Sequence, residues 1–160
     1  MEFLPQARRT REVSTFSETG NLAVEIDHHD LFDAFVKMPN SGGYGFPHSY
    51  KPAKAAKTHA ANETFNPDFF IKLAGREEIL VVEIKADGDD SNRNRAKCRD
   101  GALHFATLNE RLKEAGEPWR YRFYFLSPND YTHFFQSIRD GRYDGWKSGL
   151  LQELISGKGA

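Results

Sequence analysis

The fold is decided by the stretch Asn66-Pro67-Asp68-Phe69-Phe70-Ile71-Lys72-Leu73, followed after a short gap by Glu78-Ile79-Leu80-Val81-Val82-Glu83-Ile84-Lys85. Each half is a short run of apolar, β-branched or aromatic residues bounded by turn-forming residues, which is typical of a β-strand. A turn centred on Gly75 and Arg76 separates the two halves. The sequence therefore predicts an antiparallel hairpin.

Two carboxylates meet on one face of this hairpin. In the predicted register Asp68 lies opposite Glu83, and the Cβ atoms of such a pair are roughly 4.5–5.5 Å apart. Side chains alternate along a strand, so Lys85 shares the face of Glu83, while the opposite face is apolar and is expected to pack on a helix. Two close carboxylates repel unless a cation lies between them, which favours a divalent metal ion. The alternative is a solvent-facing Glu–Lys ion pair, which contributes little.

The residues around the hairpin carry a resemblance to a known family. Pro67-Asp68, followed after a hydrophobic run by Glu83-Ile84-Lys85, resembles the PD-(D/E)xK nuclease signature. A longer set of segments is similar to the endonuclease domain of type III restriction enzyme subunits, over roughly residues 15 to 130. These segments are Ala34-Phe35-Val36-Lys37, the stretch with Phe46, Pro47 and Tyr50, Phe65 to Phe70, and Val82 to Ala86.

The resemblance implies a fold and an activity. The fold is an α/β restriction-endonuclease-like sandwich, with a central mixed sheet of four to five strands flanked by helices. The activity is Mg²⁺- or Mn²⁺-dependent hydrolysis of phosphodiester bonds in DNA. Asp68, Glu83 and the backbone carbonyl of Ile84 are expected to hold the metal, as oxygen ligands suit these hard ions. Lys85 is expected to position the attacking water and to place positive charge near the scissile phosphate.

Two further site residues follow from the same resemblance. An acidic residue on the first helix of the family commonly completes the metal site, and Glu18 fits that role best, with Glu25 as the second choice. A basic or amide residue on the helix after the hairpin faces the site, and Lys97 is the residue in that position. The alternative for each of these residues is a charge on the protein surface. The number of metal ions, one or two, is left open by the resemblance.

The rest of the chain has an α/β pattern. Residues 15–38 are expected to contain helix, including a helical segment with Leu31, Phe32, Phe35 and Val36, and residues 39–64 are expected to be loop-rich, with a short strand after Gly45. Apolar periodicity and end signals predict further elements downstream. These are a helix from Asn92 to Leu112, a strand from Arg120 to Leu126, a helix from Ser127 to about Arg139, and a C-terminal helix containing Leu150, Leu151 and Leu154.

Other polar and aromatic groups allow a functional and a structural interpretation. Lys51, Lys54 and Lys57 form either a phosphate-binding edge or a solvated loop. Tyr44, Phe46 and Tyr50 are expected in the core rather than stacked on bases. His28 and His29 are expected to be surface residues, and Asp87 and Asp89 turn residues. Asp30 or Asp33 is expected to cap a helix.

Length and composition set wider limits. The 160 residues are expected to form a single domain, with residues 1–14 as an N-terminal arm that carries Arg8, Arg9 and Arg11. The chain has 22 basic and 23 acidic residues, so a nucleic-acid interface has to be a local basic face. A single cysteine, Cys98, excludes an internal disulfide, is expected to be a half-buried helix thiol, and suits the cytoplasm. No apolar run approaches the roughly 20 residues that span a bilayer.

The expected partners follow from the resemblance and from one missing motif. The chain has no G-x-x-x-x-G-K-[ST] loop, so the expected nuclease carries no ATP-driven motor of its own. DNA is the expected substrate, and cutting both strands requires a homodimer or a motor or specificity partner subunit. An RNA or single-strand nuclease is a second enzymatic alternative. A catalytically inactive nuclease-like module that binds nucleic acid or a protein partner is the alternative from another class.

Overall fold

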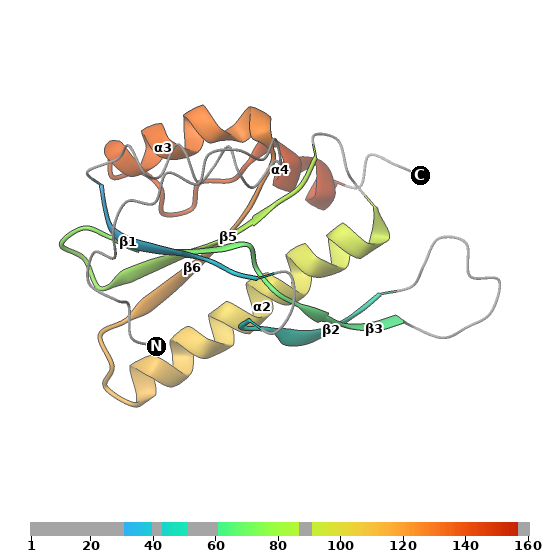
Figure 1. Ribbon diagram of the computed structural model, residues 1–160, viewed down its shortest axis with the longest axis horizontal. Helices are drawn as coiled ribbons and strands as arrows, with labels where there is room; N and C mark the ends of the chain where they lie inside the picture. Colours follow the sequence, from blue (N-terminus) through green and yellow to red (C-terminus); the bar gives the residue numbers. More distant parts are fainter. Residues whose placement is uncertain (1–30, 40–42, 51–60, 87–90, 157–160) are drawn as a thin grey trace.

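The computed structural model describes residues 31–39, 43–50, 61–86 and 91–156 (Figure 1). The strands in these ranges are β1 (Phe32–Lys37), β2 (Phe46–Tyr50), β3 (Ala61–Phe65), β4 (Phe69–Leu73), β5 (Glu78–Ile84) and β6 (Arg120–Leu126). The helices are α2 (Asn92–Glu114), α3 (Tyr131–Arg139) and α4 (Gly149–Ser156), with a short 3-10 turn, η1 (Pro128–Asp130), before α3.

Four of the strands form a mixed sheet in the order β1-β4-β5-β6. The pairs β1–β4 and β4–β5 are antiparallel, whereas β5 and β6 are parallel. A parallel pair needs a long crossover connection, which α2 supplies here. Strands β2 and β3 pair separately as a two-stranded antiparallel ribbon. The predicted α/β architecture is therefore confirmed, and the mixed sheet, expected to have four to five strands, has four.

The central hairpin has the register that the sequence predicted. Phe69 pairs with Val82, and Lys72 pairs with Ile79. The turn between the strands contains Gly75 with φ of 65°, a left-handed conformation that favours glycine. Continuing the register by one residue beyond Phe69 brings Asp68 to the position opposite Glu83. The two carboxylates are thus held by adjacent strands of one rigid hairpin.

Helices cover both faces of the sheet, as Figure 1 shows with α3 on one side and α2 on the other. On the first side, Leu80 and Val82 belong to a buried apolar cluster with Phe134 of α3. On the second side, Val81 packs in a cluster with Phe105 of α2. The apolar face predicted to pack on a helix does so. The face that carries Glu83 is covered as well, so Glu83 is only 1% exposed and a solvent-facing strand is excluded.

Helix α2 confirms the predicted helix and lies close to the sheet. It begins after Ser91, whose side chain accepts a hydrogen bond from the backbone N–H of Asn94 at 3.3 Å, a typical N-cap contact. Gly101 allows the close approach, because a Cβ atom there would lie 2.6 Å from the Phe123 ring and 3.0 Å from the Phe65 ring. The absence of a side chain at this position lets α2 lie close to Phe123 of β6 and to Phe65 at the end of β3.

One expected helical segment is a strand. Residues 32–37 form β1, in which half-buried Phe32, Ala34 and Val36 alternate with exposed residues. That period of two suits a strand paired on β4, and the backbone partners along β4 outweigh the weak helical spacing. The helix predicted to carry Leu31, Phe32, Phe35 and Val36 is therefore wrong. Asp33 caps no helix and instead pairs with Lys72 of β4.

The ribbon β2–β3 is a second departure from the predicted secondary structure. The short strand after Gly45 is present as β2, but β3 lies in a stretch expected to be loop. Cross-strand packing explains it, because Phe46 and Phe65 are paired residues with ring centroids 5.0 Å apart. Both rings are buried, and this anchors the ribbon beside α2.

The C-terminal third of the chain follows the sequence prediction. Strand β6 spans Arg120–Leu126, and η1 and α3 together reach Arg139. Helix α4 contributes Leu150 to a small apolar cluster with Cys98 and Phe125. None of the helices within the described ranges combines the length and the apolar character needed to cross a bilayer.

Candidate active site

Asp68 directly precedes β4 and is tied to the end of β5. Its Oδ2 accepts a hydrogen bond from the backbone N–H of Ile84 at 2.8 Å. This contact fixes the carboxylate beside the segment Glu83-Ile84-Lys85 and uses one of its two oxygens. The predicted role of the Ile84 carbonyl as a metal ligand stays a prediction, whereas its N–H has a clear structural role.

Glu83 is the buried centre of the site. Its Oε1 accepts hydrogen bonds from two ammonium groups, Lys85 Nζ at 2.9 Å and Lys97 Nζ at 2.8 Å. Its Oε2 is buried and has no hydrogen-bond partner among the described residues. A buried carboxylate oxygen without a partner costs about 1–3 kcal/mol or more, because the oxygen has lost its water. Such an atom needs a donor or a cation that the described side chains do not provide.

Lys97 reaches the site from α2, and the structure thus brings together residues from three elements. Its side chain is buried along most of its length, and the ammonium lies 4.9 Å from the centroid of the Phe65 ring. The sequence placed Lys97 on the helix after the hairpin but gave no signal for its contact with Phe65. The only available hint was an aromatic residue directly before Asn66-Pro67-Asp68.

The electrostatics of the site disfavour negative charge on Asp68. Burial raises the pKa of Asp68, and repulsion by Glu83 adds to this, so the value lies at about 6 instead of 3.8. The Ile84 N–H and the two lysines oppose the rise only in part. A cation near Asp68 and Glu83 would remove both the desolvation cost and the repulsion.

The two lysines differ in their surroundings. Burial opposes the charge of Lys85, but attraction to Glu83 and Asp68 outweighs it and raises the pKa of Lys85. Burial lowers the pKa of Lys97 more than Glu83 can restore, and repulsion by Lys85 and Arg93 adds to the fall. Lys85 is therefore a firmly protonated ammonium at the half-exposed edge of the site.

These residues fit a hard divalent cation. The donor set consists of carboxylate oxygens, which Mg²⁺ and Mn²⁺ prefer, and one of those oxygens is orphaned. Among the described residues no group of three or more His, Cys, Asp or Glu side chains lies within reach of one ion. The predicted third acid, Glu18 or its alternative Glu25, lies outside the described residues. Magnesium also retains several waters in many protein sites, so two carboxylates are a workable set.

Some of the other residues singled out in the sequence lie in the described ranges, and some lie outside them. Phe46 and Tyr44 pack around His104 of α2, with the Phe46 and His104 rings stacked at 3.9 Å and the Tyr44 hydroxyl 2.6 Å from His104 Nε2. Cys98 is buried, and burial raises the pKa of its thiol to about 11, so it is no nucleophile. Outside the described ranges lie Arg8, Arg9, Arg11, His28, His29, Asp30, Lys51, Lys54, Lys57, Asp87 and Asp89.

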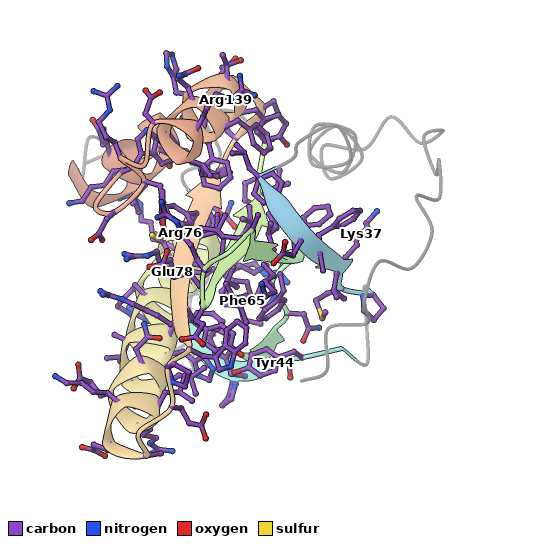
Figure 2. All side chains as sticks on the ribbon, turned by 90° about the vertical axis from the view of Figure 1, so that its left-hand side faces the viewer. Lys37, Tyr44, Phe65, Arg76, Glu78 and Arg139 are labelled. Carbon is purple, nitrogen blue, oxygen red and sulfur yellow. The ribbon has the colours of Figure 1, made fainter. Side chains whose placement is uncertain are left out.

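A second charged cluster lies around the turn end of the hairpin. Arg122 of β6 pairs with Glu78 at 3.0 Å and also with Asp144. The guanidinium groups of Arg76 and Arg122 lie 5.5 Å and 5.3 Å from the Tyr143 ring, and Figure 2 shows Arg76 close to Glu78. This cluster fastens the segment after α3 to the sheet, and its charges are matched within it.

Comparisons with known proteins found no relative of this chain. No protein-family model matches the chain, and no curated protein and no solved structure matches it either.

Proposed function

We propose that this protein is a metal-dependent endonuclease that hydrolyses phosphodiester bonds of DNA, with a restriction-endonuclease-like fold. One observation carries the proposal: Asp68 and Glu83 lie in neighbouring segments of the hairpin, Lys85 and Lys97 contact Glu83 Oε1, and Glu83 Oε2 is buried without a hydrogen-bond partner among the described residues. The similarity of Pro67-Asp68 and Glu83-Ile84-Lys85 to the PD-(D/E)xK signature supports the same assignment.

The charged residues divide the work of hydrolysis. Asp68 and Glu83 would hold Mg²⁺ or Mn²⁺, which lowers the pKa of a bound water and offsets charge on the phosphate. Lys85, held protonated by Glu83 and Asp68, would attract a phosphate oxygen and orient the attacking water. Lys97 would supply a second positive charge from α2, at the same Glu83 oxygen that Lys85 contacts. The net reaction adds one water across one P–O bond.

DNA as substrate rests on the resemblance, together with the charge of the site. Two ammonium groups and a divalent cation suit a phosphate diester, which carries a negative charge. A matched set of substrates separates the alternatives: supercoiled plasmid, linear duplex, single-stranded DNA and RNA. Cleavage confined to RNA or to single strands would replace DNA duplex as the substrate while the site stays the same.

Plasmid digestion tests the function. Wild-type protein, Asp68→Ala and Lys85→Ala are incubated with supercoiled plasmid and Mn²⁺ or Mg²⁺, with EDTA as the metal-free control. We expect nicked or linear products from the wild type only. Lys113→Ala, an exposed lysine in the last turn of α2, is the matched control and should cut like the wild type. Equal cleavage by all four proteins would exclude the proposed site.

A second candidate is a nuclease-like module that binds without cutting. It is favoured by one observation: Lys85 and Lys97 match the two carboxylates in formal charge without a metal ion. Such a module should bind its partner equally well in EDTA and in Mn²⁺, and Asp68→Ala should leave binding intact. A wild-type protein that binds DNA under both conditions and never cuts it would favour this function.

A further inference from the structure

Phe65 lies at the junction between the ribbon and the site. It is the last residue of β3, is fully buried, and precedes Asp68 by only three residues. Figure 2 shows it in the packed layer between the sheet and α2. The segment from Phe65 to Asp68 therefore supplies the site with an aromatic ring beneath Lys97 and with the carboxylate of Asp68.

The contact between Phe65 and Lys97 is favourable and directional. The Lys97 ammonium lies 4.9 Å from the ring centroid, within the roughly 6 Å over which a ring face attracts a cation. The same ammonium donates a hydrogen bond to Glu83 Oε1 at 2.8 Å. Lysine is a long side chain with many rotamers, so two contacts from different elements restrict its ammonium far more than one does.

The ring itself is locked in place. Its neighbours Phe46 and Phe123 contact it edge-on, with centroids 5.0 Å and 6.0 Å away. On the helix side a Cβ atom at Gly101 would lie only 3.0 Å from it. The ring has no room to turn away from Lys97 without moving β2, β6 or α2. Its position is thus set by the packed core and not by the site.

We propose that Phe65 is a positioning residue for the proposed nuclease reaction. Its ring holds the Lys97 ammonium against Glu83 and orients it toward the phosphate. This rests on the proposed function. Phe65 touches neither the phosphate nor the metal, and its effect on hydrolysis passes through Lys97. The contact also links the β2–β3 ribbon to the site, since the last residue of the ribbon bears the ring.

The first experiment tests the contact without relying on activity. NMR spectra of protein with ¹³C- and ¹⁵N-labelled lysine report ring-current shifts of the Lys97 ε-methylene and ammonium, assigned with Lys97→Met. We expect the ring-current shift in the wild type and in Phe65→Tyr, and its loss in Phe65→Leu. The control is Phe70→Leu, an equally buried phenylalanine of the same apolar cluster that contacts Tyr44 and Phe105 instead. An unchanged Lys97 signal in Phe65→Leu would overturn the proposal.

The second experiment asks whether Phe65 acts through Lys97. Single-turnover cleavage rates are measured for the wild type, Phe65→Leu, Lys97→Met and the double variant, all checked to be folded. A lost cation–π contact predicts a rate about tenfold lower for Phe65→Leu than for the wild type. In the Lys97→Met background the same substitution should change the rate by less than about twofold, since independent effects add and coupled ones do not. Equal losses in both backgrounds would mean that Phe65 acts on the fold alone.

The two experiments separate failure of this inference from failure of the proposed function. Wild-type protein that cuts DNA, with Phe65→Leu unimpaired and the Lys97 signal unmoved, would overturn the role of Phe65 and leave the nuclease intact. Wild-type protein that cuts no substrate would overturn the nuclease and the role of Phe65 in it. The NMR spectra would then still decide whether the ring holds Lys97.

Discussion

Glu83 of β5 and Lys97 of α2 form a 2.8 Å ion pair inside the protein, with side chains that are 1% and 11% exposed. The pair joins the central strand of the sheet to the helix that covers it. A buried pair is weak evidence of stability, since removing two charges from water costs as much as their attraction returns. Its presence beside Lys85 and Asp68 agrees with the proposed site, which would use charge in a dry place.

Removal of Lys97 should destabilise the fold. Lys97→Met leaves Glu83 buried with only Lys85 as a partner, and we expect a loss of about 2–4 kcal/mol in the free energy of unfolding. The double variant Glu83→Gln/Lys97→Met removes both charges and should regain most of this loss. Urea unfolding of the three proteins in EDTA measures the difference. A Lys97→Met protein as stable as the wild type would show that the pair is not buried as described.

Replacement of Asp68 should stabilise the metal-free protein. Because the pKa of Asp68 rises from 3.8 to about 6 on folding, the folded state binds the proton more tightly than the unfolded state. The cost of ionising Asp68 is thus absent below about pH 3.8, grows as the pH rises, and is complete above about pH 6. It amounts to about 3 kcal/mol at most. Asp68→Asn keeps the acceptor for the Ile84 N–H and avoids this cost.

The measurement for Asp68→Asn is a pair of stability profiles against pH in EDTA. The variant should be more stable than the wild type at pH 7 to 8 by about 1–3 kcal/mol, and the gap should close toward pH 4. Saturating Mn²⁺ should reverse the order, because the wild type binds the metal more tightly and gains more stability from it. A gap that is constant with pH would show that Asp68 titrates normally in the folded protein.

Lys85 should matter for the rate and little for metal binding. Loss of a positioned positive charge at the phosphate lowers a rate by about 10²–10³-fold, and we expect Lys85→Ala to fall in that range in Mn²⁺-saturated plasmid cleavage. Mn²⁺ affinity, measured by calorimetry, should be kept or slightly raised because a positive charge has gone. Lys85→Arg is the matched control for charge alone. A large loss of Mn²⁺ affinity in Lys85→Ala would place Lys85 in a structural role instead.

Gly101 should resist enlargement although alanine is the better helix former. In Gly101→Ala the new Cβ atom would meet the Phe123 ring at 2.6 Å and push α2 away from the sheet. We expect a loss of about 1–3 kcal/mol, as for overpacked cores. The exposed neighbour Ala102 provides the opposite control, because Ala102→Gly should cost about 1 kcal/mol from helix propensity alone. Thermal unfolding of both variants measures these changes in stability. A Gly101→Ala variant more stable than the wild type would contradict the close packing.

The hairpin could be predicted from sequence because its information is local. Side chains in the runs around Asp68 and Glu83 alternate between the two faces of the sheet. A single glycine turn between the runs fixes which residues pair. Helix α2 and strand β6 were also predictable, since their apolar periods and end signals lie within their own residues. The hairpin segment holds Asp68, Glu83 and Lys85, which local patterns brought together, whereas the role of Lys97 on α2 was predicted from the family resemblance.

The missed elements depend on partners far away in the chain. Residues 32–37 alternate only weakly, and they form a strand because β4 offers them hydrogen bonds. Strand β3 exists because Phe65 packs across from Phe46. The close approach of α2 to Phe123 and Phe65 depends on Gly101, and the Lys97–Glu83 ion pair joins the same helix to β5. No spacing within one segment reports such contacts, and tertiary packing overrides local propensity there.

Mn²⁺ binding tests the central claim most directly. Isothermal titration calorimetry of Mn²⁺ into the wild type, Asp68→Asn, Glu83→Gln and the control Lys113→Ala needs no substrate and no assumption about specificity. We expect binding by the wild type and Lys113→Ala, and a loss of at least tenfold in affinity in each carboxylate variant, about 1.4 kcal/mol or more. Equal affinity in all four proteins, or no binding by the wild type, would contradict the central claim.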